Sequence, residues 1–270
     1  MALPGAAEPA KRSTNMIDTV RRPLSLLALM GAALMLASPV AVYGQRGGRG
    51  ATRTAREAAA IDLTGYWVSV ISEDWKFRMV TPRKGVYETL TLNAEGRRIG
   101  DTWDPARDEA AGEQCRSYGA ANIMRVPGRL HITWQDDNTL RIDTDAGTQT
   151  RVFRFGAPPV LSGDPTWQGH SVGEWEYAPG GRGGARRGNL KVVTTNLRAG
   201  YIRKNGAPYS QNAVVTEYYD VNATPNGDHW LTVTTKVDDP LYFSRPLLTS
   251  SDFKKLSDAT GWSPTPCSAK

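Results

Sequence analysis

The sequence predicts a mostly β protein built as an antiparallel β-barrel, with a β-sandwich as the alternative. Short runs rich in Val, Thr, Trp and Tyr alternate polar and apolar residues after Ile61, which is the pattern of half-buried strands. Clusters of Asp, Asn, Gly and Pro separate these runs, as expected for turns. Strands do not alternate with helices along the chain, so a parallel α/β sheet is disfavoured.

About nine or ten strands are predicted. The clearest is Leu130–Gln135, where Leu130, Ile132 and Trp134 fall on one face and the residues between them on the other. The turns that follow make residues 130–155 a three-stranded meander, and the turn at 224–228 makes a hairpin. The strands that we delimit are, in chain order, 62–70, 130–135, 140–144, 150–155, 169–177, 190–196, 213–221, 229–237 and 247–256.

Helix is expected only within residues 93–114. Asn93 is suited to cap a short helix over 94–103, because its side chain can accept a backbone N–H of the first turn. Asp104 followed by Pro105 is the corresponding signal for a second short helix, which extends to Glu113. The fold class is therefore a barrel with two short helices near residues 93–114.

Residues 1–44 have the organisation of a secretory signal peptide. Two basic residues precede the apolar run 23–42, and small residues follow it. We expect cleavage near Gln45, a periplasmic or secreted location, and no membrane span in the mature chain. A retained membrane anchor is the alternative, because the apolar run is almost long enough to cross a bilayer. Met16 is an alternative start to Met1.

The positive charge of the chain does not indicate a nucleic-acid-binding domain. There are 33 Lys and Arg against 27 Asp and Glu, a formal net charge of +6. The excess lies in the first 44 residues and in two Gly/Arg segments, residues 45–60 and 179–188, whereas a nucleic-acid-binding domain carries it on a folded face. We expect a flexible leader at 45–60, a loop at 179–188, and a single β-rich domain over 61–270.

The two cysteines, Cys115 and Cys267, both follow the signal peptide. An oxidising compartment permits them to form a disulfide, which we predict. Two separate thiols are the alternative. Metal binding by these residues is less favoured, since neither has a second cysteine or a histidine nearby.

Two resemblances support the fold class. Gly65 and Trp67 at the first strand resemble the opening of lipocalins, where the Trp closes the base of the barrel. This likeness implies a calycin-like barrel. The helices come early in this chain, unlike those of lipocalins.

The second resemblance is at residues 169–176, Gly-His-Ser-Val-Gly-Glu-Trp-Glu, followed by a strand that ends in Thr-Thr-Asn. The segment is similar to a group of uncharacterised exported bacterial proteins with a Gly-His-Ser-x-Gly-x-Trp-Glu strand. The resemblance implies a β-rich secreted domain and carries no activity.

Our main functional hypothesis is that the barrel binds a small, largely apolar molecule in its interior. Arg151 and Arg154 point to opposite faces of their strand, so one of them points inward, either towards an acidic ligand or into a salt bridge with Glu174 or Glu217. The expected ligand contacts are Trp67, His131, Trp134, Arg154, His170, Trp175 and Tyr218.

Two other hypotheses belong to different classes. The first is an enzyme that acts on a lipid-like or aromatic metabolite by acid/base chemistry, with His170, Glu174 and Glu176 as candidates. The second is a cell-envelope module whose Gly/Arg segments contact anionic polymers. A filled interior would favour the envelope module. A cavity with a clustered His and carboxylate would favour the enzyme, and a cavity lined by aromatic residues would favour the binding protein.

Other chemistry is not expected from the sequence. No His-x-His or similar spacing supports a metal, and we expect neither a metal nor a cofactor. Ser171 lies in Gly-x-Ser-x-Gly, but its flanks are a loop and a strand instead of the strand and helix that a hydrolase nucleophile requires. Its neighbouring glycines are instead expected to allow close packing of an adjacent segment. The sequence makes no prediction of oligomeric state.

Overall fold

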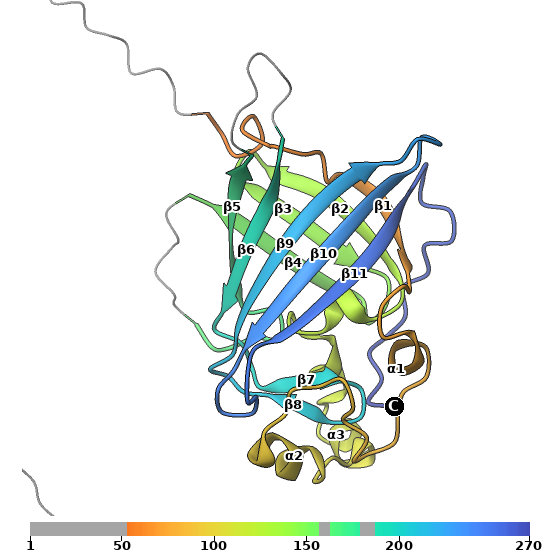
Figure 1. Ribbon diagram of the computed structural model, residues 1–270, viewed down its shortest axis with the longest axis vertical. Coiled ribbons are helices and arrows are strands. Elements are labelled where there is room, and N and C mark those ends of the chain that lie inside the picture. The colour runs from red at the N-terminus through yellow and green to blue at the C-terminus, as the bar shows by residue number, and fades with distance from the viewer. Residues whose placement is uncertain (1–52, 157–162, 179–186) are drawn as a thin grey trace, which may run out of the picture. The chain divides into compact units, whose positions relative to one another are not determined.

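Nine strands close into a barrel in the computed structural model, which describes residues 53–156, 163–178 and 187–270 (Figure 1). The predicted fold class is confirmed. The signal-like segment and much of both Gly/Arg segments lie outside the described residues. Around the barrel the strands follow the order β1-β11-β10-β9-β6-β5-β4-β3-β2.

Each strand delimited from the sequence corresponds to one strand of the barrel. The barrel strands are β1 (Gly65–Val70), β2 (Arg129–Asp136), β3 (Thr139–Thr144), β4 (Gln149–Phe155), β5 (His170–Tyr177), β6 (Gly188–Thr195), β9 (Val214–Ala223), β10 (His229–Asp238) and β11 (Leu247–Leu256). Neighbouring strands are antiparallel with one exception, since β4 and β5 run parallel, with Phe153 opposite Ser171. A parallel pair cannot be joined by a tight hairpin, and here residues 156–169 connect the two strands.

Every second residue of a barrel strand faces inward, and these side chains fill the interior. These residues form one hydrophobic cluster together with Tyr118, Ile123 and Met124. Interior side chains with no exposed surface include Trp67, Ile132, Ile142, Phe153, Leu190, Val192, Tyr219, Leu231 and Val233. A side chain without exposed surface has no water-sized space beside it, so this part of the interior leaves no room for a ligand.

An ion pair lies inside the barrel. The guanidinium of Arg151 donates to both carboxylate oxygens of Glu217, at 2.7 and 2.6 Å, and neither residue has exposed surface. Tyr219 and Thr194 provide further contacts to the guanidinium at 3.2 and 3.4 Å. Burial and the Glu217 carboxylate raise the pKa of Tyr219 well above its ordinary value. Arg151 is thus the inward arginine and Arg154 the exposed one.

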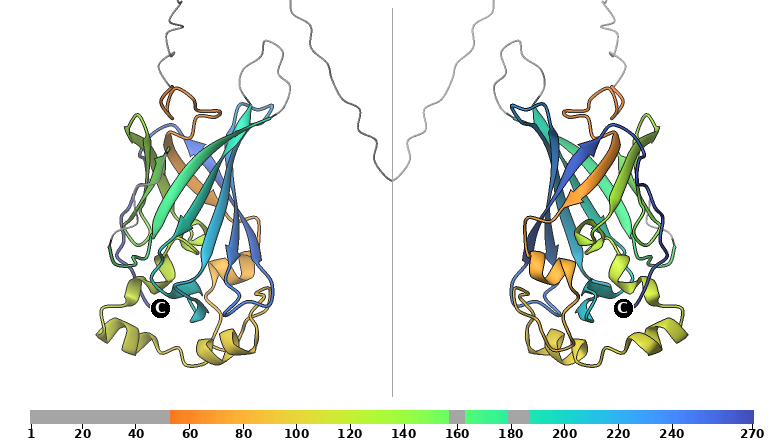
Figure 2. Two further views of the ribbon diagram at one scale, coloured as in Figure 1. Left: turned by 90° about the vertical axis from the view of Figure 1, so that its left-hand side faces the viewer. Right: turned by 90° about the vertical axis from the view of Figure 1, so that its right-hand side faces the viewer.

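Helices and a small sheet cover one end of the barrel, here called the capped end (Figures 1 and 2). Tyr209, Val237 and Phe243 belong to a second hydrophobic cluster that joins the cap to the strand ends. The elements are α1 (Trp75–Met79), α2 (Ala94–Gly100), α3 (Pro105–Ala110), the 3-10 helices η1 (Gln114–Tyr118) and η2 (Ile123–Arg125), and the paired strands β7 (Gly200–Arg203) and β8 (Ala207–Tyr209).

The two predicted helices are present, but the range to which helix was limited is too narrow. Asn93 and Asp104 cap α2 and α3 through their side chains, as predicted. The limit of 93–114 is wrong, because α1, η2 and most of η1 lie beyond it. α1 has no buried residue and no side-chain cap, so it lacks both local signals of a helix.

The opposite end of the barrel is covered by the residues that precede β1. The Trp175 indole donates to the carbonyl oxygen of Ala55 at 2.8 Å, and the Tyr177 hydroxyl donates to that of Ala58 at 2.8 Å. The amide of Ala55 donates to the Asn138 side chain at 2.9 Å. Residues 53–60, placed in the flexible leader by the sequence, therefore extend the ordered domain before Ile61.

The disulfide between Cys115 and Cys267 is present, as predicted. It joins η1 at the capped end to the segment that follows β11. This segment also contacts the β3–β4 turn, where the Thr148 hydroxyl donates to the carbonyl oxygen of Thr265 at 2.9 Å. Within the described residues, no helix combines the length and the apolar character needed to cross a membrane.

The glycines of the Gly-His-Ser-x-Gly segment allow the close packing expected of them. Gly169 has φ +60°, and a Cβ there would lie 2.4 Å from the carbonyl oxygen of Thr195. A Cβ on Gly173 would lie 3.0 Å from the Phe155 ring. Ser171 between them is buried and shares a 2.8 Å hydrogen bond with Thr194.

Candidate ligand site at the capped end of the barrel

The residues predicted to contact a ligand are not brought together. Trp67 and Trp175 lie in the interior cluster, against which Trp134 packs. The Trp67 indole donates to the carbonyl oxygen of Leu63 at 2.9 Å, and Trp175 stacks on Phe155 with ring centroids 5.5 Å apart. The outward-facing residues of the set are His131, Arg154, His170 and Tyr218. Within the part of the chain that the structure describes, these residues do not line one common pocket.

The acid/base candidates share the outer face of β5. His170, Glu174 and Glu176 alternate with the buried Ser171 and its neighbours, so none of the three points into the barrel. Burial, with a smaller contribution from the Arg154 guanidinium, lowers the pKa of His170 from its ordinary value. This outer face carries titratable groups, but the described residues form no enclosed catalytic site there.

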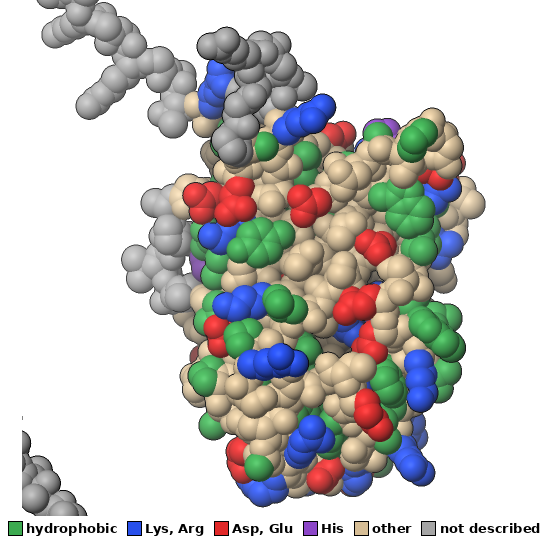
Figure 3. Space-filling model, in the orientation of Figure 1, with side chains coloured by type: hydrophobic (Ala, Val, Ile, Leu, Met, Phe, Trp, Pro, Cys, Tyr) green, Lys and Arg blue, Asp and Glu red, His purple; other side chains and the backbone are tan. Residues whose placement is uncertain are grey.

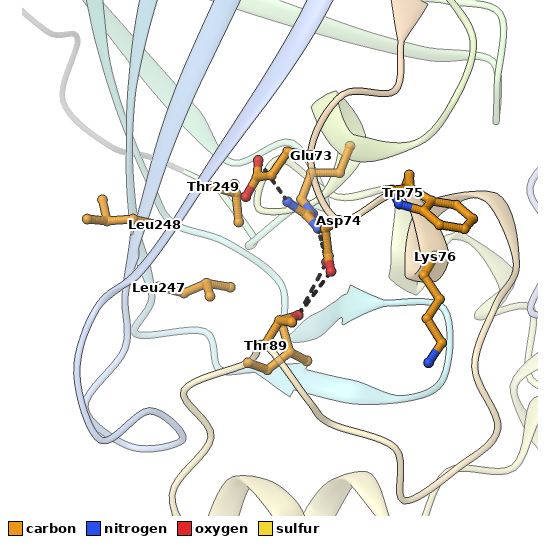
Figure 4. Close-up of a pocket in the computed structure, with 10 residues that line it drawn as sticks. Glu73, Asp74, Trp75, Lys76, Thr89, Leu247, Leu248 and Thr249 are labelled. Carbon is orange, nitrogen blue, oxygen red and sulfur yellow. Dashed lines mark hydrogen bonds and ion pairs between the residues drawn. The ribbon is translucent and has the colours of Figure 1, made fainter.

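A cleft of about 380 Å³ opens at the capped end instead (Figure 4). Its size lies within the range of small-molecule sites. The cleft is formed by the start of α1 and the residues before it, the loop before α2, η2 and the start of β11. Its lining residues are Glu73, Asp74, Trp75, Lys76, Thr89, Leu90, Arg125, Leu247, Leu248 and Thr249.

Asp74 organises the polar floor of the cleft. Its carboxylate accepts hydrogen bonds from Arg125 at 2.7 Å, from Arg203 at 3.2 Å and from the Thr89 hydroxyl at 3.2 Å. Asp74 and Thr89 both have positive φ, 53° and 70°. Residues other than glycine rarely adopt this conformation, and such strain clusters at functional sites.

Glu73 lies beside this network and is less enclosed. One of its carboxylate oxygens accepts the backbone N–H of Ser250, and that oxygen is 3.8 Å from Arg125 Nη1. The side chain is 38% exposed, against 10% for Asp74. Glu73 is therefore the carboxylate of the floor that a ligand can reach.

Apolar side chains flank the polar floor. In Figure 4, Leu247 and Leu248 lie on one side of Asp74 and Thr89, and Trp75 lies on the other. Trp75 and Leu248 are each 66% exposed. Large apolar side chains exposed together beside a cleft mark binding sites more often than single ones do. The cleft thus offers apolar walls and a charged floor.

Only a weak signal of this cleft is present in the sequence. Its residues come from four separate parts of the chain, 73–76, 89–90, 125 and 247–249. The one local cue is the run Glu73-Asp74-Trp75-Lys76, in which charged residues surround a Trp directly after a strand. Nothing in the run itself indicates Arg125 as its partner.

Neither family models, nor curated proteins, nor solved structures match this chain. The resemblances noted in the sequence therefore stay predictions. On the face shown in Figure 3, acidic and basic side chains are interspersed over the barrel.

Proposed function

We propose that this chain is an exported binding protein that holds a small amphipathic molecule in the cleft at the capped end of its barrel. The apolar part of the ligand packs between Trp75 and Leu248, and its polar group reaches the floor formed by Glu73, Asp74 and Arg125. The signal-like start of the sequence and the disulfide support export.

The exposure of Trp75 and Leu248 carries this proposal. Two large apolar side chains, each 66% exposed, face the same cleft. Covering both by a ligand removes apolar surface from water at about 25 cal/mol per Å². The buried Arg125 and the strained Asp74 then fix the orientation of the polar group, because both are held by hydrogen bonds before a ligand arrives.

The filled interior supports a site outside the barrel. The expectation of a ligand inside the barrel stays a prediction, and the fully buried Trp67, Phe153 and Tyr219 give it no support. A filled interior also favours the envelope module over the interior binding protein. The Gly/Arg segments that would make envelope contacts fall mainly outside the described residues, however, so the cleft has the stronger support.

A fluorescent amine, dansylcadaverine, tests the proposal because it combines an apolar dansyl group with an ammonium that can pair with the Glu73 carboxylate. We expect saturable binding with one probe per chain and a blue-shifted dansyl emission. Leu248→Ser should weaken binding by about tenfold, because it removes roughly one buried apolar side chain from the interface.

Leu241→Ser is the matched control. Leu241 is also an exposed leucine, 48% exposed, and it does not line the cleft. Its substitution should leave the affinity unchanged. Equal weakening by both substitutions, or the absence of saturable binding to the wild-type chain, would contradict the proposed function.

A further inference from the structure

A second, smaller cavity lies next to the cleft and has a different character. Its volume is about 40 Å³, room for about three water molecules or one small ion. Arg125 lines both this cavity and the cleft. The lining residues are Phe77, Arg78, Thr81, Asn122, Arg125, Val126, Pro127, Ile202, Arg203 and Lys204. Four of these side chains are cationic and none is a carboxylate.

Two of the four cations, Arg203 and Lys204, are not among the residues with buried nitrogens that lack a hydrogen-bond partner. Arg203 donates to Asp74 at 3.2 Å and to the Thr89 hydroxyl at 2.8 Å, and its guanidinium lies 4.6 Å from the Phe77 ring centre. Lys204 donates to the backbone carbonyl of Lys270 at 3.2 Å. These two residues contribute charge to the cavity without leaving a strong donor unused.

Arg78 and Arg125 do leave donors unused. Arg78 donates through Nε to the backbone carbonyl of Arg125 at 2.9 Å, while its Nη1 and Nη2 are buried without a hydrogen-bond partner in the described structure. Arg125, whose side chain is only 8% exposed, has an Nη1 without a hydrogen-bond partner as well, although the Glu73 carboxylate lies 3.8 Å away. A buried donor that makes no hydrogen bond lowers the stability of the fold by about 1–3 kcal/mol, and by more when the donor is charged.

The charge of Arg78 is poorly stabilised in its surroundings. Burial, and after it the positive charge of Arg125, lower its pKa to about 10. Glu73, Asp74 and Asp252 act in the opposite direction without restoring it. The attraction of these acidic groups is therefore smaller than the combined effect of burial and Arg125 on Arg78.

We propose that this cavity binds a small oxyanion between the guanidinium groups of Arg78 and Arg125. The ligand class is phosphate, sulfate or a carboxylate group, because these present several acceptor oxygens to forked guanidinium donors. The site does not require the neighbouring cleft to bind anything.

Thermal unfolding of the full chain in sodium phosphate tests this proposal, with sodium chloride of equal ionic strength as the reference. We expect phosphate to raise Tm with the logarithm of its concentration above Kd, by about 5 °C or more at a hundred times Kd. Parallel titrations with sulfate, acetate and decanoate show whether a free ion or the acid group of a longer molecule is preferred. Leu248→Ser should leave the phosphate response intact, which separates this site from the cleft.

Arg78→Met should weaken phosphate binding at least about tenfold, since it removes charged hydrogen bonds. Arg98→Met is the matched control, because Arg98 pairs with Glu95 on the exposed surface of α2. A phosphate response that Arg78→Met leaves unchanged, or one that sodium chloride reproduces, would overturn the proposal. If Arg78→Met does not fold, the wild-type chain is titrated with phosphate and the Arg78 Nε–H resonance is followed by NMR. We expect this resonance to shift. A resonance that stays in place would equally overturn the proposal.

Discussion

Glu217→Gln is the substitution that most severely tests the filled interior. It keeps the size of the side chain and removes its charge, so Arg151 is left buried without a carboxylate. The two atoms that now accept from Arg151 lie 2.7 and 2.6 Å from its nitrogens, and neither residue is exposed. Breaking one side of such a pair costs about 3–5 kcal/mol.

The corresponding fall in Tm is on the order of 10 °C for a domain of this size. It can be measured by calorimetry, with guanidinium unfolding to give the free energy. The double variant Arg151→Met/Glu217→Leu should recover most of the loss, because two apolar side chains of similar size need no partners.

The two measurements together distinguish a sealed interior from a wet one. If water reaches Arg151, Glu217→Gln costs less than about 1 kcal/mol, as for exposed ion pairs. A cost that small, or a double variant no more stable than Glu217→Gln, would refute the argument that the barrel interior is filled and dry.

Three further predictions concern other parts of the fold. Cys267→Ser should lower the free energy of unfolding by up to about 5 kcal/mol, because the disulfide links residues 152 positions apart; an unchanged denaturation midpoint would count against this. Gly169→Ala should destabilise the domain far more than Gly227→Ala. Both glycines have positive φ, but only Gly169 has a backbone oxygen where a Cβ would lie. Equal losses of stability in guanidinium unfolding would contradict this packing. The pKa of His170 measured by NMR should lie below 6.5 and rise in Arg154→Gln. Because the unfolded chain takes up this proton first, stability should fall as the pH drops below 6.5, and less so in His170→Asn; a pKa at or above 6.5 would disprove the assignment.

Features that depend on neighbouring residues in the chain were predictable from the sequence. Alternation in Leu130–Gln135 identified a strand, and Asn93 identified the start of α2, because side-chain direction and helix capping are decided within a few residues. The disulfide followed from the count of cysteines and the expected compartment.

Features that depend on distant residues were not predictable. The parallel pairing of β4 with β5 depends on the path of the connection between them, which has no sequence period. Arg125 meets Asp74 only because η2 and the start of α1 pack at the same end of the barrel. Alternation showed that Arg151 and Arg154 face opposite sides, yet choosing the inward one required the position of Glu217 across the barrel.

Tryptophan indole NMR with unlabelled decylamine shows directly where the proposed ligand binds. Trp75 borders the cleft, whereas the indoles of Trp67 and Trp175 donate to Leu63 and Ala55 within the closed barrel. We expect a saturable shift of the Trp75 indole resonance with the Trp67 and Trp175 resonances unmoved. Shifts of Trp67 and Trp175 without Trp75 would place the ligand inside the barrel and contradict the account, as would a titration that moves none of the three.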